Sequence, residues 1–302
     1  MDAERVTTRA QEVCAVIVAY DPAPQLLGNI KALAPQVAEI VVVDNASGPE
    51  GRRVLAEATK LEGISLISNT NNLGIAAALN IGVRFARDRG YPWLATFDQD
   101  STAPEGFIAA LLAACNACPD LSRVGLISPR YRDRHTGRIS SYAEGDDGPY
   151  AEVFTTMTSG NLVRIEVFNK VGFFAEEFFM DCVDHEFCLR LRSKGYRLIE
   201  ARDAELVHGL GRMTLHRAFG RTFKVFNHSP LRRYYNARNR ILVYRRYGLQ
   251  FPRWVLKDFT NLCRELAGIL LFESESLAKM AAVIRGLSGG FVGKTGKYDG
   301  RL

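Results

Sequence analysis

The chain has 302 residues, of which 47% are hydrophobic and 24% are charged, and this composition is typical of a folded protein with one large or two modest domains. Its net charge of +6 is unevenly placed, because residues 201–260 contain 13 Lys or Arg and 3 Asp or Glu. Such a basic segment suits phosphates, anionic lipid or nucleic acid, and a solvated helix face also accounts for many of its arginines.

The first nine residues are polar, and no apolar run approaches the roughly 20 residues that span a bilayer. The sequence therefore predicts neither a signal peptide nor a membrane-spanning helix. Without a secretion signal, the six scattered cysteines indicate reduced thiols and a cytoplasmic protein. Cys115 and Cys118 form an isolated pair inside an expected helix, 107–118, where packing explains them better than zinc or redox chemistry.

Short β-branched runs alternate with helical patterns in the first half of the chain. The expected strands are 13–19, 39–43, 64–67 and 93–97, and the expected helices are 24–34, 50–61 and 74–89. Continuous apolar strands that alternate with helices indicate a mostly parallel sheet that is covered on both faces.

The second half mixes further strands with a long helical region. The sequence predicts strands at 124–129, 155–164 and 196–199, a loop or loose hairpin at 131–148, and a helix at 184–193 that ends before Gly195. Helical patterns continue from Pro230 with a break at 248–252, and the Gly- and Lys-rich tail at 286–302 is expected to be mobile. We therefore expect an α/β domain over residues 1–225 and a helical extension over 226–302.

Polar residues follow several expected strands at the edge where parallel sheets bind ligands, namely Tyr20, Asp21, Asp44, Asp98, Gln99 and Asp100. Asp98 and Asp100 stand one residue apart, and two carboxylates at a strand end can bind a ribose and a divalent cation that holds a diphosphate. Alternatively, one of them caps the helix expected near Pro104. Asp44 can accept a hydrogen bond from a base or a ribose, or its segment forms an Asx turn or a helix cap.

Small and polar residues open the helix expected at 74–89. Asn72 and Gly74 precede this helix and Asn80 lies within it, beside several alanines. Small residues allow a helix to approach a ligand closely, although tight packing explains them nearly as well. No GxGxxG or Walker A motif is present, which disfavours NAD and P-loop chemistry.

A second acidic cluster follows Phe178 and Phe179 and contains Asp181, Asp184 and Glu186. Unpaired carboxylates are costly to bury, so this cluster is not expected in the core. It has the form of a general base. The alternative is that Asp181 or Asp184 caps the helix that runs to residue 193. Together, the two acidic clusters suggest transfer of a group from a nucleotide donor to a hydroxyl.

Five segments resemble glycosyltransferase family 2, and within it the branch of rhamnosyltransferases that act in rhamnolipid and O-antigen synthesis. They are Val16–Tyr20, Val43–Ser47, Asn72–Ala76, Asp98–Ser101 and His228–Asn239. The resemblance implies a GT-A fold, with a Rossmann-like sheet in a catalytic domain that binds a nucleotide sugar. It also implies that the C-terminal helical extension packs on or near the active site.

The resemblance implies dTDP-L-rhamnose as the donor, with Asp44 at its base and Asp98 at its ribose or sugar. The implied donor-binding set is Tyr20, Asp21, Asp44, Asn72, Gly74, Asn80, Asp98, Gln99, Arg232, Arg233, Tyr235 and Arg238. Arginine offers bidentate hydrogen bonds to phosphate. An amphipathic helix with its arginines in water and its tyrosines in the core also fits the last four residues.

By the same resemblance, Asp184 aligns with the family's catalytic base, although Val183 stands where an acidic residue is usual. Asp100 and His208 would bind Mg²⁺ or Mn²⁺, although a lone histidine can also be a structural hydrogen-bonding group. The implied acceptor side comprises Ser159, Gly160, Asp181 and Glu186. We therefore expect an inverting, metal-assisted single displacement in which Asp184 takes the proton of the acceptor hydroxyl.

The expected acceptor is a glycolipid or a lipid-linked glycan. An apolar set that could border a lipid, or belong to the core, comprises Phe173, Phe174, Phe178 and Phe179. A second set could rest on the cytoplasmic face of the inner membrane or pack on the sheet domain: Trp254, Phe259, Leu262, Leu266, Ile269 and Leu270, flanked by Arg253, Lys257 and Lys279.

Three other functions stay open. The same fold could use a UDP- or GDP-hexose, the basic segment could belong to a nucleic-acid-binding module, or the chain could bind a sugar nucleotide without catalysis. The absence of a recognition motif disfavours the nucleic-acid module. The presence of Asp100 and Asp184 disfavours the non-catalytic binder.

Overall fold

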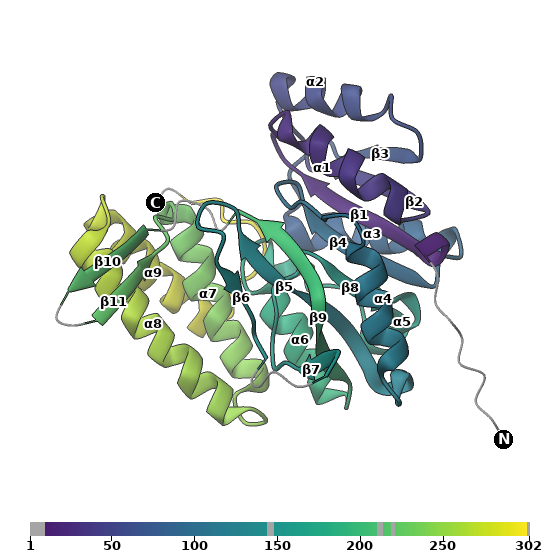
Figure 1. Ribbon diagram of the computed structural model, residues 1–302. Coiled ribbons are helices and arrows are strands. Elements are labelled where there is room, and N and C mark those ends of the chain that lie inside the picture. The colour runs from purple at the N-terminus through teal and green to yellow at the C-terminus, as the bar shows by residue number, and fades with distance from the viewer. Residues whose placement is uncertain (1–9, 144–147, 210–213, 219–220, 301–302) are drawn as a thin grey trace. The chain divides into compact units, whose positions relative to one another are not determined.

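The computed structural model describes residues 10–143, 148–209, 214–218 and 221–300. The chain divides into two compact units (Figure 1). Unit 1 comprises residues 1–175 and 187–209 and contains a large mixed sheet. Unit 2 comprises residues 176–186 and 210–302 and contains the C-terminal helices. The large sheet and the C-terminal helices therefore belong to different units.

The sheet of unit 1 has the strand order β3-β2-β1-β4-β8-β5-β9-β7, with β6 beside β5. Its strands are β1 (Val13–Ala19), β2 (Glu39–Asp44), β3 (Ile64–Ser68), β4 (Trp93–Asp98), β5 (Val124–Asp133), β6 (Ile139–Ser140), β7 (Tyr150–Glu152), β8 (Asn161–Arg164) and β9 (Arg197–His208). β1 to β4 are parallel, β8 is antiparallel to β4 and β5, and β9 is parallel to β5. The strands β1 to β5 and β9 therefore end at one edge of the sheet.

Helices cover both faces of the sheet, as Figure 1 shows for unit 1. Alternate residues of β1, among them Ala15 and Ile17, join one core with α1 (Gln25–Leu33), α2 (Pro49–Ala58) and α4 (Phe107–Ala117). The intervening residue Val16 faces α3 (Ile75–Asp88), where a Cβ added at Gly82 would collide with the Val16 side chain. The absence of a side chain at position 82 therefore sets how closely α3 approaches β1.

The elements expected in the first half agree in position with β1 to β4 and α1 to α3, and the expected fold class is confirmed. The strand expected at 155–164 is shorter, because Gly160 has a φ of +83° and β8 begins at Asn161. The strand expected at 196–199 continues in β9 as far as His208. Within the segment expected to be a loop or a loose hairpin, β5 pairs antiparallel with β6, and residues 144–147 lie outside the described residues.

Among the described α-helices and strands, four have no counterpart in the sequence analysis: β7 and α5 (Ile165–Val171) in unit 1, and the hairpin of β10 (Thr214–Ala218) and β11 (Arg221–Val225) in unit 2. The helix α6 (Val183–Ser193) lies between α5 and β10 in the chain. One boundary of the two units falls inside this helix, between Glu186 and Phe187. The first turn of α6 therefore belongs to unit 2.

Three long helices form most of unit 2: α7 (Pro230–Tyr247), α8 (Pro252–Phe272) and α9 (Ser276–Phe291). Ser229 caps α7, and its hydroxyl accepts a hydrogen bond from the backbone of Arg232. The expected mobility of the tail is wrong for its first part, because residues 286–291 complete α9. A Cβ at Gly286 would collide with the Tyr234 carbonyl, so glycine allows α9 to pack against the backbone of α7.

Part of the basic excess of residues 201–260 is neutralised inside unit 2. Arg233 is buried and lies 2.5 Å from Glu273, whose other carboxylate oxygen is 2.8 Å from Lys279. Arg240 is also buried, 2.8 Å from Asp258. These side chains do not contribute to a charged surface, and Lys279 is therefore not part of the membrane face that the sequence analysis considered.

The close approach of α3 to β1 can be tested with two glycines in helices of unit 1. Gly82→Ala is expected to destabilise the protein by roughly 1–3 kcal/mol, because the new methyl group overpacks the contact with Val16. Gly28→Ala is the matched control: no atom lies within 4 Å of its added Cβ, and alanine should stabilise α1 by roughly 0.5–1 kcal/mol. Urea unfolding measures both, and equal stability of the two variants would contradict this packing.

Candidate active site

The register of the sheet collects polar side chains at the edge where its parallel strands end. Ala19 pairs with Asp44 across β1 and β2, and Val18 pairs with Asp98 across β1 and β4. β9 ends at His208 at the same edge. Because β8 runs in the opposite direction, the residues just before it reach this edge as well. The candidate site in unit 1 therefore lies at this edge.

Asp98, Asp100 and His208 could together bind a metal ion. Each offers one ligand atom, and these atoms all lie within 4.8 Å of one another. Two carboxylate oxygens and an imidazole nitrogen suit Mg²⁺ or Mn²⁺. The sequence analysis expected Asp100 and His208 as ligands and Asp98 as a donor contact, whereas the structure brings Asp98 into the same cluster.

Two buried serines connect this cluster. The backbone N–H of Asp98 donates to Ser159 Oγ (3.0 Å), the hydroxyls of Ser159 and Ser101 are 2.7 Å apart, and Ser101 Oγ lies 2.8 Å from His208 Nδ1. Metal-binding histidines commonly have one ring nitrogen held by a hydrogen bond while the other binds the metal. Ser101 is thus a positioning residue that the sequence analysis did not select, although it stands in the segment Asp98–Ser101.

The structure gives Ser159 and Gly160 roles other than the expected contact with the acceptor. Ser159 is 1% exposed and belongs to the hydrogen-bonded chain that reaches His208. Gly160 is buried, and a Cβ there would lie 2.8 Å from Leu206 and 2.9 Å from Pro129. Both residues therefore shape the edge of the sheet from beneath.

Gln99 fastens the end of β4 to the end of β1. Its side-chain oxygen accepts from the Tyr20 N–H (2.8 Å), and its side-chain nitrogen donates to the Tyr20 carbonyl (3.1 Å). The Tyr20 ring is half exposed, so its face is available for stacking on a base. Asp21 accepts a hydrogen bond from the Gly48 N–H (2.6 Å). Of the expected donor contacts in this region, Gln99 and Asp21 thus make backbone contacts that fix the loops.

Asp44 forms the turn that the sequence analysis considered as an alternative. It is buried, and its Oδ1 accepts from the Ser47 N–H (2.9 Å). Next to it, Asn45 donates to Asn72 Oδ1 (3.0 Å), and the same Asn72 oxygen accepts from the Gly74 N–H (2.9 Å). These contacts hold the loop before α3 against the end of β2, with Gly74 at a φ of +86°.

Asn80 does not reach the edge as a donor contact. It is 1% exposed, its side-chain nitrogen donates to the Phe174 carbonyl, and its side-chain oxygen accepts from the Phe174 N–H, both at 2.9 Å. Its side chain holds the backbone of Phe174 through both of these hydrogen bonds. Phe174 itself is buried against Phe168 and Phe187 and belongs to the core.

A cation that the sequence analysis missed lies beside the metal-binding cluster. Arg134 donates from its guanidinium to the Asp100 carbonyl (2.6 Å) and to Thr102 Oγ1 (3.1 Å). It belongs to the polar segment after β5, where the sequence carries no motif that would single it out. Its placement provides positive charge next to the cluster of Asp98, Asp100 and His208.

In unit 2, Asp184 lies in the first turn of α6 and is partly buried. Its Oδ1 accepts from the neighbouring His185 N–H (2.8 Å). A carboxylate in the first turn of a helix is favoured by the helix dipole. The loop before it is strained, because Phe179, Asp181 and Cys182 have φ values of 64°, 59° and 58°. Asp184 is therefore preceded by a loop that requires external support.

That support comes from two buried residues of α7. The side-chain nitrogen of Asn239 donates to the carbonyls of Phe178 (2.9 Å), Met180 (2.6 Å) and Asp181 (3.0 Å). Arg238 donates to the Phe178 carbonyl (3.0 Å) and to the carbonyl of Gly296 in the C-terminal tail (2.6 Å). Arg238 is 1% exposed, and it holds both the loop and the tail.

Burial and neighbouring charges both shift the pKa of Asp181, which stands three residues before Asp184. Burial raises the pKa of its carboxyl, Arg232 opposes the rise, and the neighbouring Asp184 adds to it. Arg232 Nε is 3.1 Å from Asp181 Oδ1, and the Arg232 side chain is half exposed. Arg232 is thus the exposed member of the four residues of α7 that were expected to bind the donor.

The remaining expected contacts of unit 2 are buried and engaged. Arg233 forms the ion pairs described above, and Tyr235, which is 1% exposed, accepts from the Tyr298 N–H (2.7 Å). Glu186 is 2% exposed and accepts from the Tyr247 hydroxyl (2.7 Å). The side chains of Arg233, Tyr235 and Glu186 are thus engaged within unit 2.

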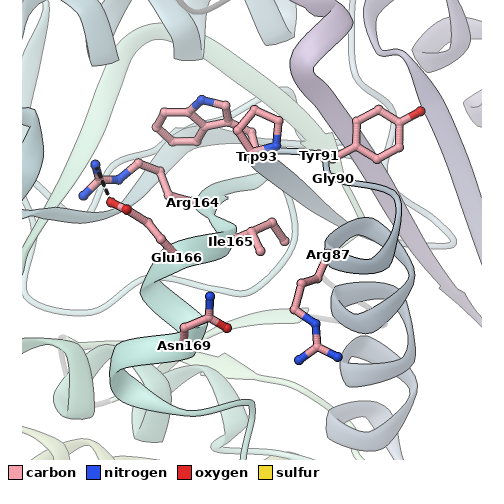
Figure 2. Close-up of a pocket in the computed structure, with 9 residues that line it drawn as sticks. Arg87, Gly90, Tyr91, Trp93, Arg164, Ile165, Glu166 and Asn169 are labelled. Atoms are coloured by element: carbon pink, nitrogen blue, oxygen red, sulfur yellow. Dashed lines mark ion pairs between the residues drawn. The ribbon is translucent and has the colours of Figure 1, made fainter.

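A separate hollow lies at the other edge of the sheet of unit 1 (Figure 2). Its lining includes Trp93, the first residue of β4, and the ion pair of Arg164 and Glu166 at 2.8 Å. Asp98 is the last residue of the same strand. The hollow is therefore a full strand length from the acidic cluster and is not part of the candidate site.

Solved structures share this fold. The chain is 16% identical to the mannosyltransferase PcManGT from Pyrobaculum calidifontis, solved with GDP-Man and Mn²⁺, with a TM-score of 0.61 over 94% of this chain and 88% of that one. It is 17% identical to GalNAc-T7, solved with UDP, GalNAc and Mn²⁺, with a TM-score of 0.55 over 69% of this chain and 44% of that one.

The class of the protein is glycosyltransferase, as a family model and a curated relative show. The chain belongs to glycosyltransferase family 2, whose family model, Glycosyl transferase family 2, matches residues 14–174. It is also 32% identical over 251 residues to the dTDP-rhamnosyl transferase RfbF of Shigella flexneri, which covers 78% of this chain and 80% of that one. The family expected from the sequence motifs is thereby confirmed.

The metal-binding cluster predicts a graded response to substitution. Asp100→Asn and His208→Ala should each abolish measurable Mn²⁺ binding, since each removes one of three ligands. Ser101→Ala should weaken it roughly 10–100-fold, because the histidine loses the group that orients it. Titration calorimetry with Mn²⁺ measures these affinities. Asp203→Asn, an exposed carboxylate on the strand of His208, should bind as the parent does, and unchanged binding by Asp100→Asn would contradict the site.

The support of the loop before Asp184 predicts an effect on catalysis. Asn239→Ala removes three hydrogen bonds from that loop, and a displaced base is expected to lower kcat on the order of 10²-fold. Asn236→Ala, on the same helix and partly buried, is the matched control with near-parent turnover. Steady-state kinetics below the melting temperature of each variant give the comparison. Full kcat in folded Asn239→Ala would exclude a positioning role.

Proposed function

We propose that the chain transfers L-rhamnose from dTDP-L-rhamnose to a hydroxyl group of a glycolipid or a lipid-linked glycan. The observation that supports this donor is the 32% identity over 78% of the chain to a dTDP-rhamnosyl transferase. The residues of the candidate site fit a nucleotide diphosphate, because the end of β4 carries two carboxylates beside a histidine and Arg134.

The donor is proposed to bind at the strand ends of unit 1. The half-exposed ring of Tyr20 would stack on the base, and the turn at Asp44 would border it. Asp98, Asp100 and His208 would hold Mg²⁺ or Mn²⁺, and a bound divalent cation neutralises the charge that develops on a leaving diphosphate. Arg134 is the cation of unit 1 that is proposed to meet the phosphates.

Asp184 is proposed as the general base. It takes the proton of the acceptor hydroxyl while that oxygen forms a bond to the anomeric carbon. The bond from the anomeric carbon to the phosphate oxygen breaks at the same time, dTDP departs, and the configuration inverts in a single displacement. Assistance by a base of this kind contributes on the order of 10²–10⁴-fold.

Replacement of the base tests the mechanism. Asp184→Asn is expected to lower transfer on the order of 10²–10⁴-fold while leaving donor affinity within a few fold, because the amide keeps its size but accepts no proton. Mass spectrometry of the product and donor titration measure the two quantities. Asp203→Asn, an exposed carboxylate of β9, is the control. Near-parent turnover in Asp184→Asn would remove this residue from the mechanism.

The donor assignment has its own test. Thermal shifts in the presence of Mg²⁺ rank dTDP-L-rhamnose against UDP- and GDP-hexoses, and the largest shift is expected with dTDP-L-rhamnose. The favoured donor is then incubated with rhamnosylated lipids and undecaprenyl-linked glycans, and products are identified by mass. A larger shift with a UDP- or GDP-hexose would retain the enzyme class and change the sugar.

A further inference from the structure

The helix α8 of unit 2 exposes an apolar stripe (Figure 1 shows the helix). Leu256, Phe259, Leu270 and Leu271 have exposed fractions of 67%, 51%, 55% and 52%, and Cys263 between them is exposed as well. At 3.6 residues per turn, these side chains share one side of the helix over roughly 20 Å. Globular proteins usually turn such a stripe towards their core. The core side of α8 is a different one, since it carries the buried residues Leu262 and Ile269.

Positive charge accompanies the stripe. Arg253, Lys257 and Arg264 are exposed, and helical geometry places them about 60–100° around α8 from the centre of the stripe, all on the same flank. The two carboxylates of α8, Asp258 and Glu265, instead contact arginines of α7. The exposed side of the helix is therefore apolar along its centre and cationic along one flank.

This combination favours an anionic lipid surface over other partners. A second copy of the chain would bring the same three cations together across a two-fold axis, which like charges oppose. An apolar protein surface would leave those cations without counter-charges. No helix of the described part of the chain is long and apolar enough to cross a bilayer, so a contact through α8 would lie along the surface.

We propose that α8 lies in the interface of a membrane that contains anionic lipid. Leu256, Phe259 and Leu270 enter the acyl region, and the cationic flank meets the phosphate groups of the lipids. The helix α9 has a similar stripe with a single basic residue, Arg285, inside it, and the proposal is confined to α8. It does not depend on the identity of the donor sugar.

Vesicle binding by the full chain tests the proposal. In flotation, we expect binding to phosphatidylcholine vesicles that contain phosphatidylglycerol to be roughly tenfold tighter, or more, than binding to phosphatidylcholine alone. About 1 M NaCl should weaken it by a similar factor, because the Debye length falls to about 3 Å. Cys263 is the exposed cysteine and the other five are buried, so an environment-sensitive dye attached there should shift to the blue on binding.

Matched variants separate the apolar and the cationic contributions. Leu256→Ser with Phe259→Ser should lose binding roughly tenfold or more, and so should Arg253→Gln with Lys257→Gln and Arg264→Gln, while thermal melting stays as in the parent because all five positions are exposed. Arg253→Lys with Arg264→Lys keeps the charge and should keep the binding. Ile139→Ser, an exposed apolar position in unit 1, is the control for general surface hydrophobicity.

Three results would overturn the proposal. One is an absence of binding of the parent chain to anionic vesicles. Another is binding that the double variant of Leu256 and Phe259 leaves unchanged. The third is a concentration-dependent dimer, measured by light scattering without vesicles, that the same double variant dissociates, since this would assign the stripe to a second copy.

Discussion

The register of β1 against β2 and β4 is the constraint on which the candidate site depends. These strands are buried along their length, so charged residues occur where the strands end, at Asp44 and Asp98. A slip of one residue would turn every side chain to the opposite face. Gln99 reinforces the register, because it bonds both backbone groups of Tyr20 just beyond the last paired residues. The positions of Asp44 and Asp98 are therefore set by hydrogen bonds between strands that begin deep in the core.

The serines beneath the acidic pair extend this constraint across the sheet. Ser159 precedes β8, Ser101 follows β4, and His208 ends β9. Three segments that are far apart in the sequence therefore meet in one chain of hydrogen bonds. Buried polar groups are stable only when their hydrogen bonds are made. Here the Ser159 hydroxyl bonds the Asp98 N–H and Ser101, and the Ser101 hydroxyl bonds Ser159 and His208. The metal-binding residues thus have their positions fixed before any ligand arrives, which is the condition for electrostatic preorganisation.

Unit 2 solves a different problem by the same means. The left-handed conformations of Phe179, Asp181 and Cys182 cost on the order of 1–3 kcal/mol per residue, and no neighbouring strand pairs with their loop in the described part of the chain. The side chains of Arg238 and Asn239 replace the missing backbone partners. This explains how Arg238, in the middle of α7, can be buried and still contribute to the loop ahead of Asp184.

The sequence alone predicts the sheet and its ligand-binding edge, because buried parallel strands are continuous apolar runs and the acidic residues interrupt them. It does not predict which polar residues of a helix face inward. The resemblance places Asn80, Arg233 and Arg238 at the donor, whereas in the structure their side chains bond a buried carbonyl or carboxylate. Ser101 and Asn239 lay inside recognised segments, and their roles depend on residues about sixty or more positions away.

Residues of the C-terminal tail, which are synthesised after the strands of unit 1, hold residues of α7 in place. The carbonyl of Gly296 and the N–H of Tyr298 complete bonds with Arg238 and Tyr235, the first of which also holds the loop ahead of Asp184. The strands of unit 1 are nearly all present a hundred residues earlier in translation. On the ribosome, a nascent chain can therefore complete the strand ends that carry Asp98 and Asp100 well before Gly296 is available to bond Arg238, which holds the loop ahead of Asp184.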